Sequence, residues 1–275
     1  MSTAALFRWN GDALVELDHC DPAEDRLEAA DSLLVSDGLA FAPALHRARF
    51  LAAAHARGAG LDGYSDASAA AVWNAAVALL PATGDWFPRV EILSHDGTAR
   101  FQYRHRSAPD RTRSVRLITH RGPDSRTAPA VKGPDLDALL AARTAAQGHG
   151  ADDVVLLTPD GYVIDGGTSA IVWWRGDILC GPPPGADDEA FARVDSVTAA
   201  GLFTLAAALG VETHRERTTP AELDGAEVWA LGALHGIRMV THWVDGPELA
   251  ELPGRIGVWR DRRSALRKPI GEHTP

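Results

Sequence analysis

The feature that most constrains the fold is a series of short stretches, alternating in polarity, that tight turns join in pairs. Residues 87–106 alternate apolar and polar side chains on either side of Asp96-Gly97, and residues 5–20 do so around Asn10-Gly11. Asn-Gly and Asp-Gly favour the two-residue turns that connect antiparallel strands. Further pairs follow at 153–165 and 169–181. The chain is therefore predicted to form antiparallel hairpins and not a doubly wound parallel sheet.

Helical stretches separate these pairs of strands. Residues 44–58 and 66–84 have helical spacing and end at glycine or proline, and 135–150 and 195–210 give two more helices. The last of these would begin at Asp195 or Ser196 as its N-cap. Single strands are expected at 113–120 and within 227–246, while the tail from 267 to 275 is expected to fray.

The segment 122–131 is dense in proline, glycine and arginine, which is typical of a connection between domains. We therefore predict an α/β (α+β) protein with an N-terminal domain at 1–121, a linker at 122–131 and a C-terminal domain at 132–275. Because strands and helices are interleaved in both parts, each domain is expected to be mixed.

The composition argues against several classes of partner. The chain carries a formal net charge of −10, so nucleic acid or an anionic membrane would repel it. No apolar run has the length of a membrane span, and residues 1–13 lack the pattern of a signal peptide. Cys20 and Cys180 are interpreted as reduced core residues of a cytoplasmic protein. No histidine or cysteine spacing predicts a metal site.

Lys132 is unusual because the chain has only one other lysine, Lys268, against twenty-five arginines. It lies just before a predicted helix, whose N-terminus disfavours a cation by a few tenths of a kcal/mol to about 1 kcal/mol. A positive field and partial burial make an amine nucleophilic towards carbonyl groups. Lys132 is thus a candidate Schiff-base lysine. Taken alone, the residue has a simpler interpretation as a solvated loop lysine.

Other residues could complete a pyridoxal phosphate (PLP) site, which needs a lysine, a carboxylate for the pyridine nitrogen and a phosphate cradle. The helix start at Ser196, Val197 and Thr198 offers N–H groups and a hydroxyl to an anion. Asp165 ends a strand before Gly-Gly, where a ligand can approach. Arg49 could donate to a phosphate. Each has a simpler alternative: a helix cap, a tight turn and a solvated arginine.

The order of these motifs links them. "DSLLVSDGLAFAPALHRARF" comes first, followed by "PDSRTAPAVKGPDLDALLAAR", "GADDVVLLTPDGYVIDGGTSAIVWWRGDILCGPP", "DSVTAAGLFTLAAALGV" and "AEVWALGALHGIRMVTHWVDG". Together they resemble the fold-type IV PLP enzymes, the class IV aminotransferase family, and are most similar to its aminodeoxychorismate lyase-like branch. The resemblance covers roughly residues 30–246 and is most specific in 130–183. It implies two α/β domains with the cofactor between them, in a homodimer.

The resemblance also implies roles by position. Lys132 would form the Schiff base with PLP and then move the substrate proton, and Asp165 would bind the pyridine nitrogen. Arg49 would hold the phosphate, in the family's H-x-x-R pattern with His46. The remaining cofactor contacts would come from Ser196, Val197, Thr198, Ala233 and Leu234, and the substrate contacts from Arg104, Arg106 and His235.

Several positions depart from the family's pattern. Asp165 stands in place of a glutamate, and the phosphate motif reads Ser196-Val197-Thr198 where the family has Gly-Ile-Thr, so it keeps the hydroxyl but loses the glycine. Gly232 stands where close relatives have asparagine, and Ala233 where aminotransferases often have a phosphate-binding threonine. Phe41 takes about the place of a threonine that some lyases of the family use.

Three functions are consistent with this resemblance. The first is a PLP-dependent lyase that eliminates pyruvate from aminodeoxychorismate or a similar small molecule to give 4-aminobenzoate or a related aromatic amine. The second is a PLP-dependent amino acid aminotransferase of class IV. The third is a divergent member that has lost the cofactor or the chemistry, an alternative that Asp165, Gly232 and Ala233 leave open.

Overall fold

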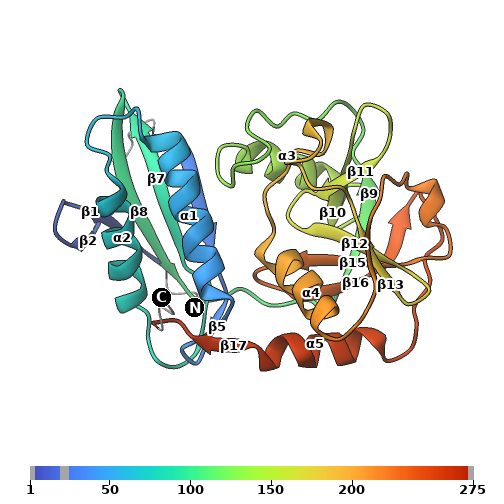
Figure 1. Cartoon of the computed structure of the whole chain (residues 1–275). Helices are drawn as coiled ribbons and strands as arrows, with labels where there is room; N and C mark the ends of the chain where they lie inside the picture. The colour runs from blue at the N-terminus through green and yellow to red at the C-terminus, as the bar shows by residue number, and fades with distance from the viewer. Residues whose placement is uncertain (1–3, 19–24, 272–275) are drawn as a thin grey trace. The chain divides into compact units, whose positions relative to one another are not determined.

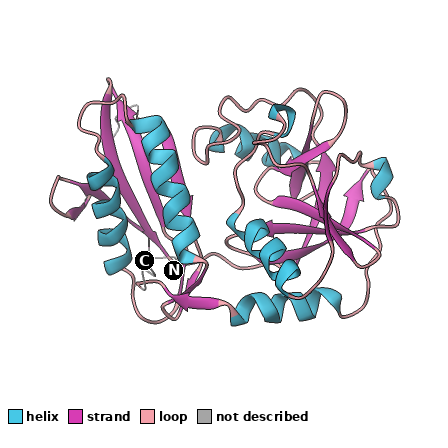
Figure 2. Cartoon of the chain, in the orientation of Figure 1, coloured by secondary structure: helices cyan, strands magenta, loops and turns pink. Residues whose placement is uncertain are grey.

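The computed structural model describes residues 4–18 and 25–271 and divides the chain into two compact units. The N-terminal unit comprises Met1–Asp110, Val131–Pro134 and Leu266–Pro275, and the central unit comprises Arg111–Ala130 and Asp135–Ala265. Both units combine strands with helices (Figure 2). The predicted mixed composition of each part is therefore confirmed.

The N-terminal unit is built on an antiparallel sheet in the order β2-β1-β8-β7-β3, with two helices along it (Figure 1). Its elements are β1 (Ala4–Trp9), β2 (Leu14–Glu16), β3 (Arg26–Ser32), β7 (Arg89–His95), β8 (Thr98–Arg106), α1 (Pro43–Gly58) and α2 (Asp66–Ala78). Both predicted hairpins pair as expected, β1 with β2 and β7 with β8. Large apolar side chains such as Phe50, Trp73 and Tyr103 fill the space between helices and sheet.

A small second sheet in this unit has the order β17-β5-β4-β6. Its strands are β4 (Val35–Ser36), β5 (Leu39–Phe41), β6 (Asp85–Trp86) and β17 (Arg267–Pro269). Fraying of the tail was the wrong expectation for 267–269, because these residues pair with β5 and Lys268 lies opposite Ala40. Residues 272–275 lie outside the described part of the chain.

The central unit contains a mixed sheet in the order β11-β10-β9-β16-β15-β12-β13-β14. Its strands are β9 (Ser114–Thr119), β10 (Asp153–Leu157), β11 (Val163–Gly166), β12 (Ala170–Arg175), β13 (Ile178–Gly181), β14 (Thr213–Arg215), β15 (Glu227–Gly232) and β16 (Gly236–Val244). The predicted hairpins β10–β11 and β12–β13 form. Strand β9, however, lies parallel to both β10 and β16.

Helices α3 (Leu136–Gln147), α4 (Val197–Ala208) and α5 (Arg255–Ala265) belong to the central unit. Helix α4 begins after Ser196, whose hydroxyl accepts from the Ala199 N–H at 3.2 Å, so Ser196 and not Asp195 is the N-cap. Helix α5 was not predicted, because its Arg-rich outer positions obscure the two buried residues that anchor it, Ile256 and Trp259.

The division into units differs from the predicted domain boundaries on both sides of the linker, in the linker itself and at the C-terminus, where Leu266–Pro275 groups with the N-terminal unit. Strand β9 groups with the central unit and not with residues 1–110. Most of the predicted linker also belongs there, because Asp135 accepts from the N–H groups of Thr127 at 2.8 Å and Ala128 at 2.9 Å. Residues 131–134, which carry Lys132, group with the N-terminal unit.

Three further properties concern membrane-spanning helices, metal sites and cysteines. Within the described residues no helix combines the length and apolarity needed to cross a membrane, and no cluster of three or more His, Cys, Asp or Glu side chains could hold a metal ion. Cys180 is buried as a free thiol, as predicted, and Cys20 lies outside the described residues.

Candidate active site

Lys132 is attached through its backbone to the edge of the N-terminal sheet. Strand β3 is the last strand of that sheet, and the Ala30 N–H donates to the Lys132 carbonyl oxygen at 2.7 Å. The next residue, Gly133, has φ +144°, and a Cβ there would lie 2.8 Å from the Ala29 Cα. Only glycine permits so close an approach of two backbones. This contact explains why residues 131–134 group with the N-terminal unit.

Arg49 and His46 lie one helical turn apart on α1 and share a carboxylate. Asp31 accepts from the Arg49 Nε at 2.7 Å through one oxygen and contacts the His46 Nδ1 at 2.7 Å through the other. The side chain of Asp31 has no exposed surface, and that of His46 is 3% exposed. The predicted H-x-x-R pair is therefore anchored on strand β3.

The charges around Asp31 decide its ionisation. Burial disfavours the carboxylate, but His46 and Arg49 outweigh it, so the pKa of Asp31 lies below its ordinary value. Burial lowers the pKa of His46, Asp31 opposes the shift, and Arg49 and Lys132 add to it. An ionised Asp31 only accepts hydrogen bonds, so the neutral His46 carries its proton on Nδ1.

Asp165 lies on β11 opposite Leu156 and is half-buried. Its Oδ1 atom is shielded from solvent and has no hydrogen-bond partner among the described residues. Burial raises the pKa of Asp165 to about 7, while Arg193 and Arg126 act in the opposite direction. A carboxylate oxygen without a partner is costly in a folded protein, which suits a group that a ligand completes.

The start of α4 is the predicted phosphate cradle. Val197 and Thr198 are buried there, at 5% and 2% exposure. The first N–H groups of an α-helix have no partner within the helix and carry partial positive charge. Ser196 uses its hydroxyl as the cap, so its side chain orders this helix start.

Ala233, Leu234 and His235 form the turn that joins β15 to β16, and Gly232 pairs with Gly236 across it. The Thr112 N–H donates to the His235 Nδ1 at 3.1 Å, so a neutral ring carries its proton on Nε2. Burial lowers the pKa of His235 to about 4, and Arg238, Arg143 and Arg111 add to the shift. His235 is therefore a neutral N–H donor in a positive environment.

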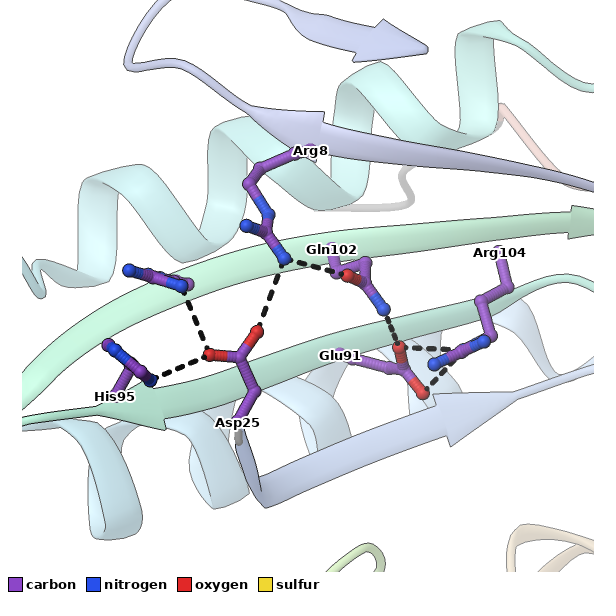
Figure 3. Close-up of polar contacts among 7 residues, drawn as sticks. Arg8, Asp25, Glu91, His95, Gln102 and Arg104 are labelled. Atoms are coloured by element: carbon purple, nitrogen blue, oxygen red, sulfur yellow. Dashed lines mark hydrogen bonds and ion pairs between the residues drawn. The ribbon is translucent and has the colours of Figure 1, made fainter. Parts of the chain in front are cut away.

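Arg104 and Arg106 lie on one face of β8, and both have partners there. Buried Glu91 accepts from the Arg104 Nε at 2.9 Å and from the Gln102 amide at 2.8 Å (Figure 3). The Arg106 Nε donates to the Phe87 carbonyl at 2.6 Å. Burial, followed by the neighbouring arginines, lowers the pKa of Arg106. Arg89 also forms an ion pair with Glu91, so three guanidinium groups beside a single carboxylate leave this face positive.

The predicted residues thus form two groups. Lys132, His46 and Arg49 come together in the N-terminal unit, where Arg104 and Arg106 also lie. Asp165, the start of α4 and the turn at 233–235 lie in the central unit. Residues 28–243 match the family model for amino-transferase class IV. The chain belongs to the class IV aminotransferase family.

Solved structures of class IV aminotransferases have the same fold. A hypothetical aminotransferase from Mycobacterium tuberculosis in a PLP-bound form has a TM-score of 0.78 and 21% identity, covering 96% of this chain and 98% of that one. A fold IV transaminase from Curtobacterium pusillum gives 0.75 and 20%, covering 98% and 100%. The branched-chain amino acid aminotransferase of Escherichia coli gives 0.77 and 15%, covering 98% and 97%.

These likenesses confirm the predicted mixed α/β fold of the class IV family and do not single out its lyase-like branch. A comparison with curated proteins finds no significant match. The family assignment therefore rests on the family model, and the fold on the structures.

Sequence reasoning missed two residues of this class IV family member. Asp31 anchors Arg49, and its signal was a carboxylate in the otherwise uncharged run "AADSLLV", which β4 and β5 separate from the H-x-x-R helix. Gly133 admits the Lys132 backbone to β3, and nothing in the sequence indicates which backbone it meets.

Proposed function

We propose that this protein is a PLP-dependent enzyme that acts on the amino group of a small molecule. The observation that carries the proposal is the Oδ1 of Asp165, which is shielded from solvent on β11 and has no hydrogen-bond partner within residues 4–18 and 25–271. The protonated nitrogen of a pyridine ring is the partner that such an oxygen lacks. Aspartate is one methylene shorter than the family's glutamate, so the Asp165 carboxylate would reach the ring nitrogen only with a shifted cofactor or through a bridging water.

The other residues fit the remaining parts of PLP. Lys132 would hold the aldehyde, and Arg49 would donate to the phosphate. The backbone N–H groups of Val197 and Thr198, with the turn at Ala233 and Leu234, would surround the phosphate. Ser196 would contribute by ordering the helix start. Arg104, Arg106 and His235 remain the proposed substrate contacts.

The proposed chemistry follows from these positions. PLP supplies an electron sink for the electron pair left when a substrate C–H bond breaks. The Lys132 Nζ would leave the aldehyde to the substrate amine, accept the proton of the α-carbon and return it. Asp165, as a carboxylate, would hold a proton on the ring nitrogen. His235 would orient an acceptor group of the substrate through its Nε2–H.

Two reactions follow from this common start. The sequence resemblance favours a lyase that releases pyruvate from an aminodeoxychorismate-like substrate. The solved structures of similar fold are described as aminotransferases, which favours amino transfer to an oxo acid. Two parallel incubations separate them, one with amino donors and an oxo acid and the other with aminodeoxychorismate. A new amino acid without pyruvate release supports the aminotransferase, and pyruvate release with an aromatic amine supports the lyase.

The cofactor itself is tested by colour. Addition of PLP to the purified protein should give a visible absorbance band that Lys132→Ala abolishes, with Lys268→Ala as the matched control that keeps it. Lys268 suits this purpose because it lies on β17, paired with β5. Absence of the band in the wild-type protein would support the divergent, cofactor-free alternative. A homodimer and a cytoplasmic location stay predictions.

A further inference from the structure

We propose that Asp31 is a positioning residue that sets the guanidinium of Arg49 for the phosphate of PLP. The inference rests on the proposed function, because it concerns the same cofactor. It adds a residue of the chain that would not touch the cofactor and would act only through Arg49.

The first support is geometric. Asp31 meets α1 with both oxygens, one at 2.7 Å from the Arg49 Nε and the other at 2.7 Å from the His46 Nδ1. A carboxylate that engages the Nε of an arginine fixes the plane of the guanidinium and the direction of its two terminal nitrogens. Arg49 is 17% exposed at its side chain, whereas Asp31 is fully buried. The anchor is thus inside the unit and the guanidinium at its edge.

The second support is the strand on which Asp31 lies. Its neighbour Ala30 donates a backbone hydrogen bond to Lys132 at 2.7 Å. Adjacent residues of β3 therefore hold the proposed Schiff-base lysine through the backbone and the proposed phosphate arginine through a side chain. The spacing between these two groups is then set by one rigid strand, which a cofactor with an aldehyde and a phosphate at fixed separation requires.

The third support is the charge balance. Burial lowers the pKa of His46, and Arg49 and Lys132 add to the shift, so the cations that act on this group are Arg49 and Lys132. The buried carboxylate of Asp31 is paired with the Arg49 guanidinium that we propose for the phosphate.

The experiment compares PLP with pyridoxal, which lacks the phosphate. Dissociation constants for both are measured on the cofactor-free protein for the wild type, Asp31→Asn, Arg49→Gln and the double variant. We expect Asp31→Asn to weaken PLP binding about 10- to 100-fold, the range seen for outer partners of ligand-binding groups. Pyridoxal binding should stay within about twofold. In a protein that already carries Arg49→Gln, Asp31→Asn should not weaken PLP binding further, because Asp31 acts only through the Arg49 guanidinium.

The matched control is Asp25→Asn. Like Asp31, Asp25 contacts basic side chains with both oxygens, but its donors are two arginines, Arg8 at 3.2 Å and Arg100 at 3.1 Å; Asp25 and Arg8 are labelled in Figure 3. This substitution removes the same charge from the same unit, so it should lower the unfolding temperature and leave the ratio of PLP to pyridoxal affinity unchanged. Should Asp31→Asn fail to fold, Asp31→Glu keeps both oxygens and should weaken PLP selectively by a smaller factor.

Two results would overturn the inference. One is an unchanged PLP dissociation constant in a folded Asp31 variant of a protein that binds PLP. The other is an equal loss of PLP and pyridoxal binding, which would mark Asp31 as a general structural residue. Failure of the wild type to bind PLP is a different outcome, since it refutes the proposed function together with this inference.

Discussion

Substitution of Gly133 by alanine tests the contact that holds Lys132 against strand β3. The Cβ would meet backbone atoms only, the Ala29 Cα at 2.8 Å and the Ala29 carbonyl carbon and the Ala30 nitrogen at 3.0 Å. A side chain could rotate away, but a paired strand cannot. The φ of +144° adds strain of its own for any residue with a Cβ.

The size of the effect follows from the two ways in which the chain can respond. Keeping the contact costs about 1–3 kcal/mol of backbone strain and about 1–3 kcal/mol of overpacking. Releasing residues 131–134 costs one backbone hydrogen bond, about 0.5–1.5 kcal/mol, and part of the burial of Val131, about 1 kcal/mol. Release is cheaper. Gly133→Ala should therefore displace Lys132 and leave the rest of the fold intact.

The assay has two readouts on the same sample. Thermal unfolding of the cofactor-free variant should fall by about 4–10 °C, since 1 kcal/mol shifts a unit of this size by about 2–4 °C. The visible band on addition of PLP should need at least about tenfold more cofactor, which corresponds to about 1.4 kcal/mol. Circular dichroism should show unchanged secondary structure.

Gly122→Ala is the matched control, because Gly122 also has a positive φ, +121°, but no atom lies within 4 Å of its Cβ position. Gly122→Ala should therefore show only the effect of backbone strain, which is a small drop in the unfolding temperature with normal PLP binding. If Gly133→Ala behaves like Gly122→Ala in both readouts, the close approach of the two backbones is refuted.

Two further predictions concern ionisation. Asp165 has a folded pKa of about 7 against an ordinary 3.8, so the cofactor-free protein binds the extra proton between these values and loses stability as the pH rises through that window. Asp165→Asn should remove this loss, which is at most about 4 kcal/mol at about 1.4 kcal/mol per pH unit and is reduced by solvent screening at this half-buried residue. Urea unfolding at pH 4.5 and pH 8 gives the unfolding free energy at each pH. The same change in that free energy for both proteins would contradict the prediction. His235 has a folded pKa of about 4 against an ordinary value of 6.5, so it should stay neutral down to pH 5 and lower the stability only as the pH falls below 6.5. Nitrogen-15 NMR of the ring should show a protonated Nε2 and an unprotonated Nδ1 over this range. Titration of the ring near pH 6.5 would refute the buried, positive environment.

Local chemistry allowed much of the fold to be predicted. Asp96-Gly97 joins β7 to β8 as the expected two-residue turn, and both of its residues have positive φ. Strands β1 and β2 also pair as expected, but across the four residues 10–13, of which only Gly11 has positive φ. Ser196 caps its helix for a similarly local reason. The order of motifs around Lys132 also indicated the class IV family, which the family model confirms.

Non-local pairing lay outside the reach of the sequence. Strand β9 lies parallel to β10 and β16, partners distant along the chain that no turn specifies. Helix α5 was not predicted, because the charged residues of its outer face obscure the spacing of its two buried residues, Ile256 and Trp259. These features depend on which surfaces meet after folding, and a periodic pattern records only that a surface exists.

The site divides in the same way. The residue types of the site are evident in the chain before folding: a rare lysine before a helix, an H-x-x-R pair and a carboxylate before Gly-Gly, because chemistry selects side chains one at a time. The anchoring of Arg49 by Asp31 and the position of residues 131–134 on the edge of β3 arise only in the folded unit. Both depend on backbones far apart in sequence coming within hydrogen-bonding distance, which packing of the whole unit brings about.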